Sequence, residues 1–160
     1  MVNQTENHKK FLKHLRESDD AVHKIKNWLE QGGCIVTKPE NTEAKTQNEW
    51  KNHVDSGDLF VNFMGKDHVI EVKRLSIFFT SKDDWVFGTK FIVCEKNSFD
   101  RRIIKPFMYI ILNKNMTHIA VVMEATKNNW YIEKRTDKRY DNVTQEFYLV
   151  PLEYVKWYKL

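Results

Sequence analysis

The segment Leu59–Leu75 constrains the fold most strongly, because it predicts two β-strands joined by a tight turn. Apolar and β-branched residues run from Leu59 to Met64 and again from His68 to Leu75. Gly65 lies between the two runs, where a turn residue is expected between paired strands. We therefore expect an antiparallel hairpin at this point in the chain.

The geometry of this hairpin brings three charged residues together. Side chains alternate across a strand, so Glu71 and Lys73 project from the same face, about 7 Å apart along the strand. A two-residue turn at Met64-Gly65 places Asp58 opposite Glu71, and a turn at Gly65-Lys66 places Asp58 opposite Lys73. Either register puts Asp58 beside the other two charged residues.

The spacing of Asp58, Glu71 and Lys73 leaves two interpretations open. In the first, a divalent cation lies between the two carboxylates, which would otherwise repel each other. Mg²⁺ favours carboxylate oxygen, and a nearby lysine could orient the attacking water or stabilise charge on a phosphate. In the second, Asp58 is a turn residue, while Glu71 and Lys73 form a solvated ion pair on an exposed strand face.

The rest of the chain predicts one α/β domain, residues 1–160, with a mixed central β-sheet flanked by helices. A stripe of apolar residues predicts a helix that starts near Ser18 and ends at Gly32-Gly33. An earlier helical piece around Leu12 either continues into this helix or stands apart. Further strands are expected at residues 34–38, 90–96, 106–114, 118–125, 130–136 and within 148–160, with a helical turn within 98–105 and a strand or strand extension at 76–80.

Composition excludes several classes of protein. The two cysteines, Cys34 and Cys94, form no CxxC pair, so a zinc site is not expected. No apolar run approaches the roughly 20 residues of a membrane span, and the N-terminus has no signal-peptide core, so we expect a soluble, cytoplasmic protein with no membrane partner. Residues 1–80 hold 12 cationic and 12 acidic side chains, so the whole net charge of +4 belongs to residues 81–160. That excess is compatible with a polyanionic partner such as DNA.

Two motifs resemble the core signature of the PD-(D/E)XK nuclease superfamily. "SGDLFV" followed by "VIEVKRL" matches its acidic residue and (D/E)-x-K on adjacent strands, and "DDAVHKIKNWLEQGGCIV" is similar to the helix-Gly-strand that precedes them. The chain has Gly57-Asp58 where the family name has Pro-Asp, as in the group that includes archaeal Holliday-junction resolvases. The resemblance covers about residues 17–75.

This resemblance implies a fold, an activity and a set of roles. The fold is restriction-endonuclease-like, with an αβββαβ order of elements, and the activity is Mg²⁺-dependent hydrolysis of DNA phosphodiester bonds, with Mn²⁺ as a substitute. Asp58, Glu71 and the Val72 carbonyl would hold the metal, and Lys73 would be the catalytic lysine. Asp20 or Glu17 would supply a further acid, unless these two only complement the helix dipole.

Basic residues of the hairpin and of the second half of the chain are candidates for contact with DNA phosphates. They are Arg74, Lys82, Arg101, Arg102, Lys105 and Lys114. Ordinary solubilising charge is the alternative for all of them. His53 could approach the site from the loop before Asp58, whereas His68 should lean away from Glu71.

The size of the chain suggests a homodimer or higher homo-oligomer, because cutting both strands of DNA calls for two symmetric sites. Homing, junction-resolving and restriction-type endonucleases all fit, and a phage or mobile-element origin would suit each of them. The alternative is a nucleic-acid-binding module that keeps the nuclease fold and does not cleave.

Overall fold

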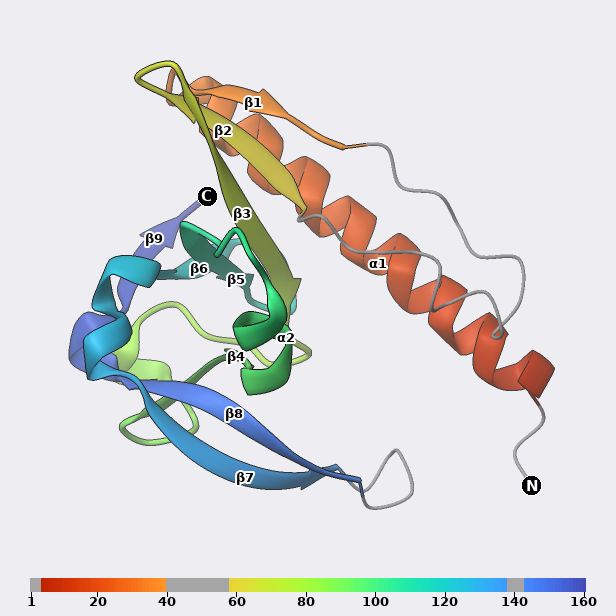
Figure 1. Ribbon diagram of the computed structural model, residues 1–160. Coiled ribbons are helices and arrows are strands. Elements are labelled where there is room, and N and C mark those ends of the chain that lie inside the picture. Colours follow the sequence, from red (N-terminus) through yellow and green to blue (C-terminus); the bar gives the residue numbers. More distant parts are fainter. Residues whose placement is uncertain (1–3, 40–57, 138–142) are drawn as a thin grey trace.

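The computed structural model describes residues 4–39, 58–137 and 143–160, and it shows a mixed α/β fold (Figure 1). The helices are α1 (Gln4–Gln31) and the short α2 (Lys96–Arg101), and 3₁₀ turns cover Lys82–Asp84, Glu124–Asn129 and Leu152–Tyr154. The strands are β1 (Ile35–Thr37), β2 (Leu59–Phe63), β3 (Lys66–Arg74), β4 (Lys90–Glu95), β5 (Met108–Leu112), β6 (His118–Met123), β7 (Tyr131–Asp137), β8 (Val143–Pro151) and β9 (Lys156–Lys159). The predicted α/β class is confirmed. Within the described ranges, no helix is long and apolar enough to cross a membrane.

α1 is one continuous helix, so the predicted helix start at Ser18 is wrong. A serine inside a helix costs at most about 0.7 kcal/mol relative to alanine, which is too little to interrupt a long helix. The predicted end is correct, because the Gly33 amide donates to the Glu30 carbonyl (3.0 Å) and the Cys34 amide to the Leu29 carbonyl (3.0 Å). This pattern is a Schellman motif, and the φ of +88° at Gly33 is the left-handed conformation that the motif requires.

The main sheet has six strands in the order β1-β2-β3-β5-β6-β9. β3 and β5 pair in parallel, and every other neighbouring pair in this sheet is antiparallel. α1 packs against β3 and β1 on one face of the sheet. This arrangement makes β3 a central strand whose C-terminal end lies beside the middle of α1 (Figure 1).

The predicted hairpin is confirmed, with its turn at Met64-Gly65. Phe63 pairs with Lys66 and Leu59 pairs with Ile70. Both turn residues have positive φ, 52° at Met64 and 79° at Gly65, as a type I′ turn requires. Of the two registers that the sequence allowed, this is the one that places Asp58 opposite Glu71.

A second sheet of three strands, in the order β4-β8-β7, covers the other side of the molecule, so the expectation of a single sheet is wrong. Phe91 and Val93 of β4 and Tyr148 and Val150 of β8 are buried in a cluster with residues of β5 and β6. The main sheet has apolar residues on both faces, and each face needs a covering layer. α1 covers one face, and the second sheet with α2 covers the other.

The two faces of the main sheet carry two separate hydrophobic clusters. On the α1 side, Ala21, Val22 and Ile25 pack with a cluster that includes Ile70 and Val72. On the opposite side the cluster is aromatic, and it consists of Phe79, Trp85, Phe91, Val93, Phe99, Tyr109, Ile111, Ala120, Val122, Trp130, Tyr148, Val150 and Val155. Strand alternation therefore puts Glu71 on the aromatic side of the sheet, away from α1.

The segment 76–80 forms neither a strand nor a strand extension, which corrects the sequence prediction. Phe79 leaves the strand direction and is fully buried in the aromatic cluster. A buried asparagine holds this segment against the β5–β6 turn. Asn113 Nδ2 donates to the Phe79 carbonyl (2.9 Å), and Asn113 Oδ1 accepts from the Thr117 amide (2.9 Å).

Candidate active site

Asp58 lies at the point where the β2–β3 pairing ends. Its amide donates to the Ile70 carbonyl (3.3 Å), and its carboxylate Oδ2 accepts from the Val72 amide (2.7 Å). The side-chain oxygen thus takes the place that a main-chain carbonyl of β2 would hold in a longer ladder. Both contacts are to the residues on either side of Glu71, so the structure brings Asp58 directly beside the E-x-K segment.

Glu71 forms an ion pair with Arg102, which follows α2 in the chain. Glu71 Oε1 accepts from Arg102 Nη1, and the two side chains are only 17% and 21% exposed. Arg102 is one of the candidate phosphate contacts, and the structure instead places its guanidinium on a predicted metal ligand. A positive charge therefore already lies at Glu71, where the metal is expected.

Val72 and Lys73 complete the predicted set. The amide and carbonyl of one strand residue point to the same side of the strand. The Val72 carbonyl therefore points toward Asp58, as its amide does, while its side chain is buried against α1. Lys73 shares the face of Glu71 by strand alternation, and it is exposed.

The chemistry of these donors fits a hard divalent cation. Two carboxylates and one main-chain carbonyl are oxygen ligands of the kind that Mg²⁺ binds, and Mg²⁺ keeps several waters of its own. A carboxylate has about four lone-pair positions, so the bond from the Val72 amide leaves Asp58 able to bind a cation. The described residues contain no group of three or more His, Cys, Asp or Glu side chains that could hold a metal. Among the described residues, the predicted further acid, Asp20 or Glu17, therefore does not join Asp58 and Glu71 in such a group.

Cys94 and Tyr109 lie near Glu71 on the same side of the sheet. Tyr109 is the residue of β5 that pairs with Glu71, and its side chain is hydrogen-bonded to Cys94. Burial raises the pKa of the Cys94 thiol to about 11, and the charges of Asp100 and Glu71 also raise it. Burial likewise raises the pKa of the Tyr109 phenol. Both groups are therefore neutral at neutral pH, whereas Arg102 is a charged partner of Glu71.

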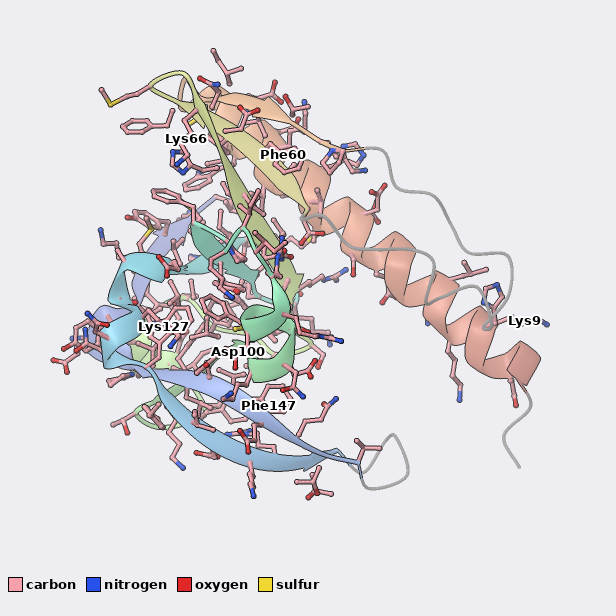
Figure 2. The ribbon with its side chains drawn as sticks, in the orientation of Figure 1. Lys9, Phe60, Lys66, Asp100, Lys127 and Phe147 are labelled. Carbon is pink, nitrogen blue, oxygen red and sulfur yellow. The ribbon has the colours of Figure 1, made fainter. Side chains whose placement is uncertain are left out.

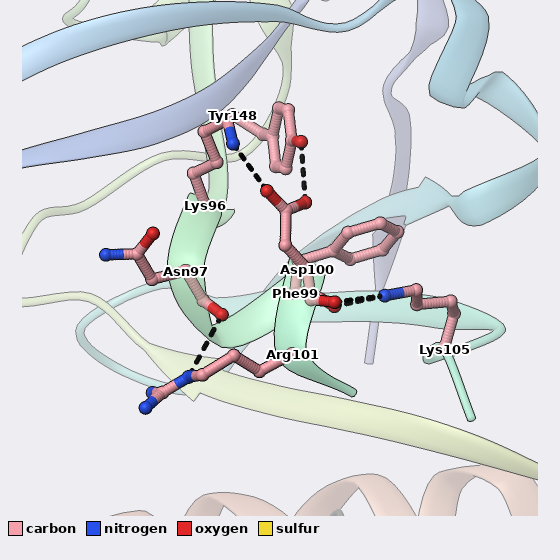
Figure 3. Close-up of polar contacts among 7 residues, drawn as sticks. All are labelled: Lys96, Asn97, Phe99, Asp100, Arg101, Lys105 and Tyr148. Atoms are coloured by element: carbon pink, nitrogen blue, oxygen red, sulfur yellow. Dashed lines mark hydrogen bonds and ion pairs between the residues drawn. The ribbon is translucent and has the colours of Figure 1, made fainter. Parts of the chain in front are cut away.

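α2 is fixed by polar contacts that could not be predicted from the sequence (Figure 3). The Asp100 carboxylate accepts from Tyr148 on β8 (2.7 Å) and from Lys96 one turn earlier (2.5 Å). The bond from Lys96 is the larger cause that holds the pKa of Asp100 below its ordinary value, and the bond from Tyr148 is the next. An acid near a basic segment was the only signal in the sequence, and its tyrosine partner is 48 residues away.

The two candidates for a further acid, Asp20 and Glu17, are exposed on α1. They line a surface hollow together with Lys9, Leu12 and Lys13. Asp20 comes directly before the buried Ala21, in the part of α1 that packs under β3.

The other basic candidates have varied surroundings. Arg74 donates to the Lys114 carbonyl from Nε (3.0 Å) and Nη2 (2.6 Å), which ties the end of β3 to the β5–β6 turn. Arg101 donates to the Asn97 carbonyl (3.2 Å), and Lys105 donates to the Asp100 carbonyl (3.1 Å). Lys82 and Lys114 are exposed. Arg102 is the candidate for which the structure shows an ion pair with a predicted metal ligand.

His53 and His68 are the two histidines near the hairpin in the sequence. His68 lies in β3, and its ring contacts those of Phe107 (4.7 Å between centroids) and Phe63 (6.4 Å). His68 therefore packs against aromatic rings. His53 lies outside the described residues.

Comparison with protein-family models, with curated proteins and with solved structures found no match for this chain. The functional assignment therefore depends on the residues of the site and on their geometry.

Proposed function

We propose that this protein is a metal-dependent DNA endonuclease of the PD-(D/E)XK type, with a restriction-endonuclease-like core. One observation carries the proposal. At the end of β2, the carboxylate of Asp58 is hydrogen-bonded to the main chain of the Glu71-Val72-Lys73 segment. This contact brings the acid of the first strand beside the E-x-K of the second, as the family signature requires.

The order of elements around the site supports the same proposal. α1 is followed by β1, β2 and β3, then by β4 and α2, and then by β5, which pairs with β3 in parallel. If β4 is an addition to the core, the remaining order is compatible with the αβββαβ order that the family resemblance implies. The strands β4, β7, β8 and β9 would be additions to that core.

Each residue of the site has a proposed role. Asp58, Glu71 and the Val72 carbonyl would hold Mg²⁺ or Mn²⁺, which supplies Lewis acidity to a phosphate and to the attacking water. Lys73 would orient that water or stabilise the negative charge that develops on the phosphate. Arg102 would leave Glu71 and pair with a DNA phosphate, since a guanidinium binds phosphate in a bidentate fashion.

This exchange of partners by Arg102 couples DNA binding to metal binding. As long as Arg102 is paired with Glu71, a cation must compete with a guanidinium for the carboxylate. A DNA phosphate that pairs with Arg102 frees Glu71 to bind the metal. Bound DNA should therefore raise the affinity of the protein for the metal, and bound metal should raise its affinity for DNA. The complete metal site would then form only when DNA is bound.

A second candidate is a DNA-binding module without cleavage activity. The ion pair between Glu71 and Arg102 favours it, because a protein cation there can satisfy the carboxylate permanently. The two candidates make opposite predictions about divalent metal. The nuclease needs metal at Glu71, whereas the binding module should bind DNA equally well with metal or with EDTA.

The test is a cleavage assay with supercoiled plasmid, linear duplex, branched DNA and RNA, each in Mg²⁺, Mn²⁺ or EDTA. We expect metal-dependent cleavage of DNA by the wild type, and its loss in Asp58→Ala and Lys73→Ala. Lys159→Ala is a matched control, because Lys159 is exposed on β9, which β5 and β6 separate from β3, and it is not among the candidate DNA contacts. Metal-dependent cleavage that survives both site substitutions would refute the site. DNA binding without cleavage would establish the second candidate.

We further propose that the active form is a homodimer, because cutting both strands of DNA requires two sites. Light scattering coupled to size-exclusion chromatography, with and without DNA, tests this. A monomer that makes double-strand cuts would refute it.

A further inference from the structure

Two adjacent isoleucines project into solvent immediately after α2. Ile103 is 99% exposed and Ile104 is 70% exposed. Single apolar side chains on a surface are ordinary. Two in succession, almost fully hydrated and next to a predicted active site, need a partner that covers them.

The isoleucine pair is held rigidly at both ends. On one side, the Arg102 amide donates to the Phe99 carbonyl at the end of α2 (3.2 Å), a main-chain contact that does not depend on the partner of the Arg102 side chain. On the other, Lys105 donates to the carbonyls of Phe99 and Asp100 at the end of α2, Pro106 is buried, and the Phe107 amide donates to the Val69 carbonyl (2.7 Å). The Ile103-Ile104 pair, called the tip below, is therefore held by well-ordered contacts on both sides. Little conformational entropy should be lost when the tip binds a partner.

Charge beside the tip identifies the kind of partner. Arg101 and Arg102 precede the isoleucines and Lys105 follows them, so cationic groups stand on both sides of an apolar point. Cations that contact the backbone, combined with an isoleucine that enters between two bases, are the means by which proteins unstack and bend DNA. Two isoleucines are also too small a surface for a stable contact with a second copy, which needs about 800 Å² per partner.

We infer that Ile103-Ile104 is a wedge that enters a DNA base step next to the cut phosphate. The inference rests on the proposed function, because Arg102 places the tip beside Glu71. Opening a step costs least where stacking is already weak or interrupted. The wedge thus selects DNA with a branch, a nick or a mismatch over continuous duplex, and the substrate class is distorted DNA.

The test measures base unstacking directly, without cleavage. Branched and continuous duplexes that carry 2-aminopurine at the step next to the branch are titrated with protein in EDTA. We expect the wild type to raise the fluorescence several-fold on branched DNA and to bind it at least tenfold more tightly than continuous duplex. Ile103→Ser combined with Ile104→Ser should lose most of both effects. Because both side chains are exposed, this double variant should melt as the wild type does.

Ile35→Ser is the matched control, since Ile35 is an equally exposed isoleucine (70%) on the far strand β1. The wedge is refuted if the double variant keeps the fluorescence rise and the preference for branched DNA. It is also refuted if the double variant, unlike the control, loses DNA binding only because a dimer has become a monomer. Failure of the proposed function looks different, because the wild type would then unstack the step in EDTA and cut nothing in Mg²⁺. A wild type that cuts DNA in Mg²⁺ but shows no fluorescence rise refutes the wedge alone.

Discussion

Replacing Arg102 by alanine should strengthen metal binding and weaken the fold at the same time. The side chains of Arg102 and Glu71 are 21% and 17% exposed, so most of each is shielded from water. Two unit charges about 4 Å apart attract by about 4 kcal/mol at an effective dielectric constant of 20. After desolvation, the net value of a hydrogen bond to a charged group is about 1.5–3 kcal/mol. In EDTA, we expect Arg102→Ala to unfold more easily by that amount.

The same free energy is what a metal must overcome in the wild type. Every 1.4 kcal/mol is a tenfold change in affinity, so Arg102→Ala should bind Mn²⁺ about 10- to 100-fold more tightly than the wild type in the absence of DNA. Metal at 100 times its dissociation constant stabilises a fold by about 2.7 kcal/mol, so Mn²⁺ should restore the stability that the variant loses in EDTA. Calorimetric titration with Mn²⁺ and urea denaturation with Mn²⁺ or EDTA measure the two effects.

The neighbouring Arg101→Ala variant is the control for this pair of measurements. Arg101 is exposed, and its guanidinium donates to the Asn97 carbonyl, not to Glu71. It should bind Mn²⁺ as the wild type does. Equal Mn²⁺ affinity in Arg102→Ala, Arg101→Ala and the wild type would refute the competition between guanidinium and metal at Glu71.

Three further predictions concern other residues. Asp58→Asn keeps an oxygen for the Val72 amide but loses the charge, so Mn²⁺ binding and cleavage should be lost while the free energy of unfolding changes by less than about 1 kcal/mol; unaltered Mn²⁺ titration would contradict this. Asn113→Ala leaves the buried Phe79 carbonyl and the Thr117 amide without this partner. We expect the free energy of unfolding, measured by urea denaturation, to fall by about 2–4 kcal/mol. A fall below about 1 kcal/mol would argue against this role of Asn113. The pKa of the Cys94 thiol is about 11 in the folded chain, against an ordinary value of 9.0. As the pH rises, the unfolded chain therefore loses this proton before the folded chain does. The free energy of unfolding should fall between pH 9 and pH 11. Cys94→Ala should show a smaller fall over that pH range, and an identical fall would refute the assignment.

The hairpin could be predicted because its signals are local. Alternation of side chains and a short turn fix which residues face each other, and the structure adopts one of the two registers that the sequence allowed. The proximity of Asp58 to Glu71 followed from that register. The helix end at Gly33 was also a local signal, since a left-handed residue is needed there.

The partners of the other strands could not be predicted, because their choice depends on distant parts of the chain. β4 alternates in a way that suits either sheet, and it pairs with β8, more than 50 residues away. The contact between Glu71 and Arg102 is of the same kind, since it joins residues 31 positions apart on different elements. A basic residue near a helical turn was visible in the sequence, but its carboxylate partner was not.

The bond between Asp100 and Tyr148 has a consequence for the timing of synthesis. Tyr148 belongs to β8, which emerges from the ribosome long after the hairpin and α2. Until β8 is made, α2 lacks the support that positions Arg102 and the isoleucines that follow it. A nascent chain that already carries Asp58, Glu71 and Lys73 would therefore lack a fixed position for the element that we propose contacts DNA. Formation of β8 is therefore the step that fixes α2, and on the proposed function a chain that has not yet formed β8 would lack an ordered contact with DNA.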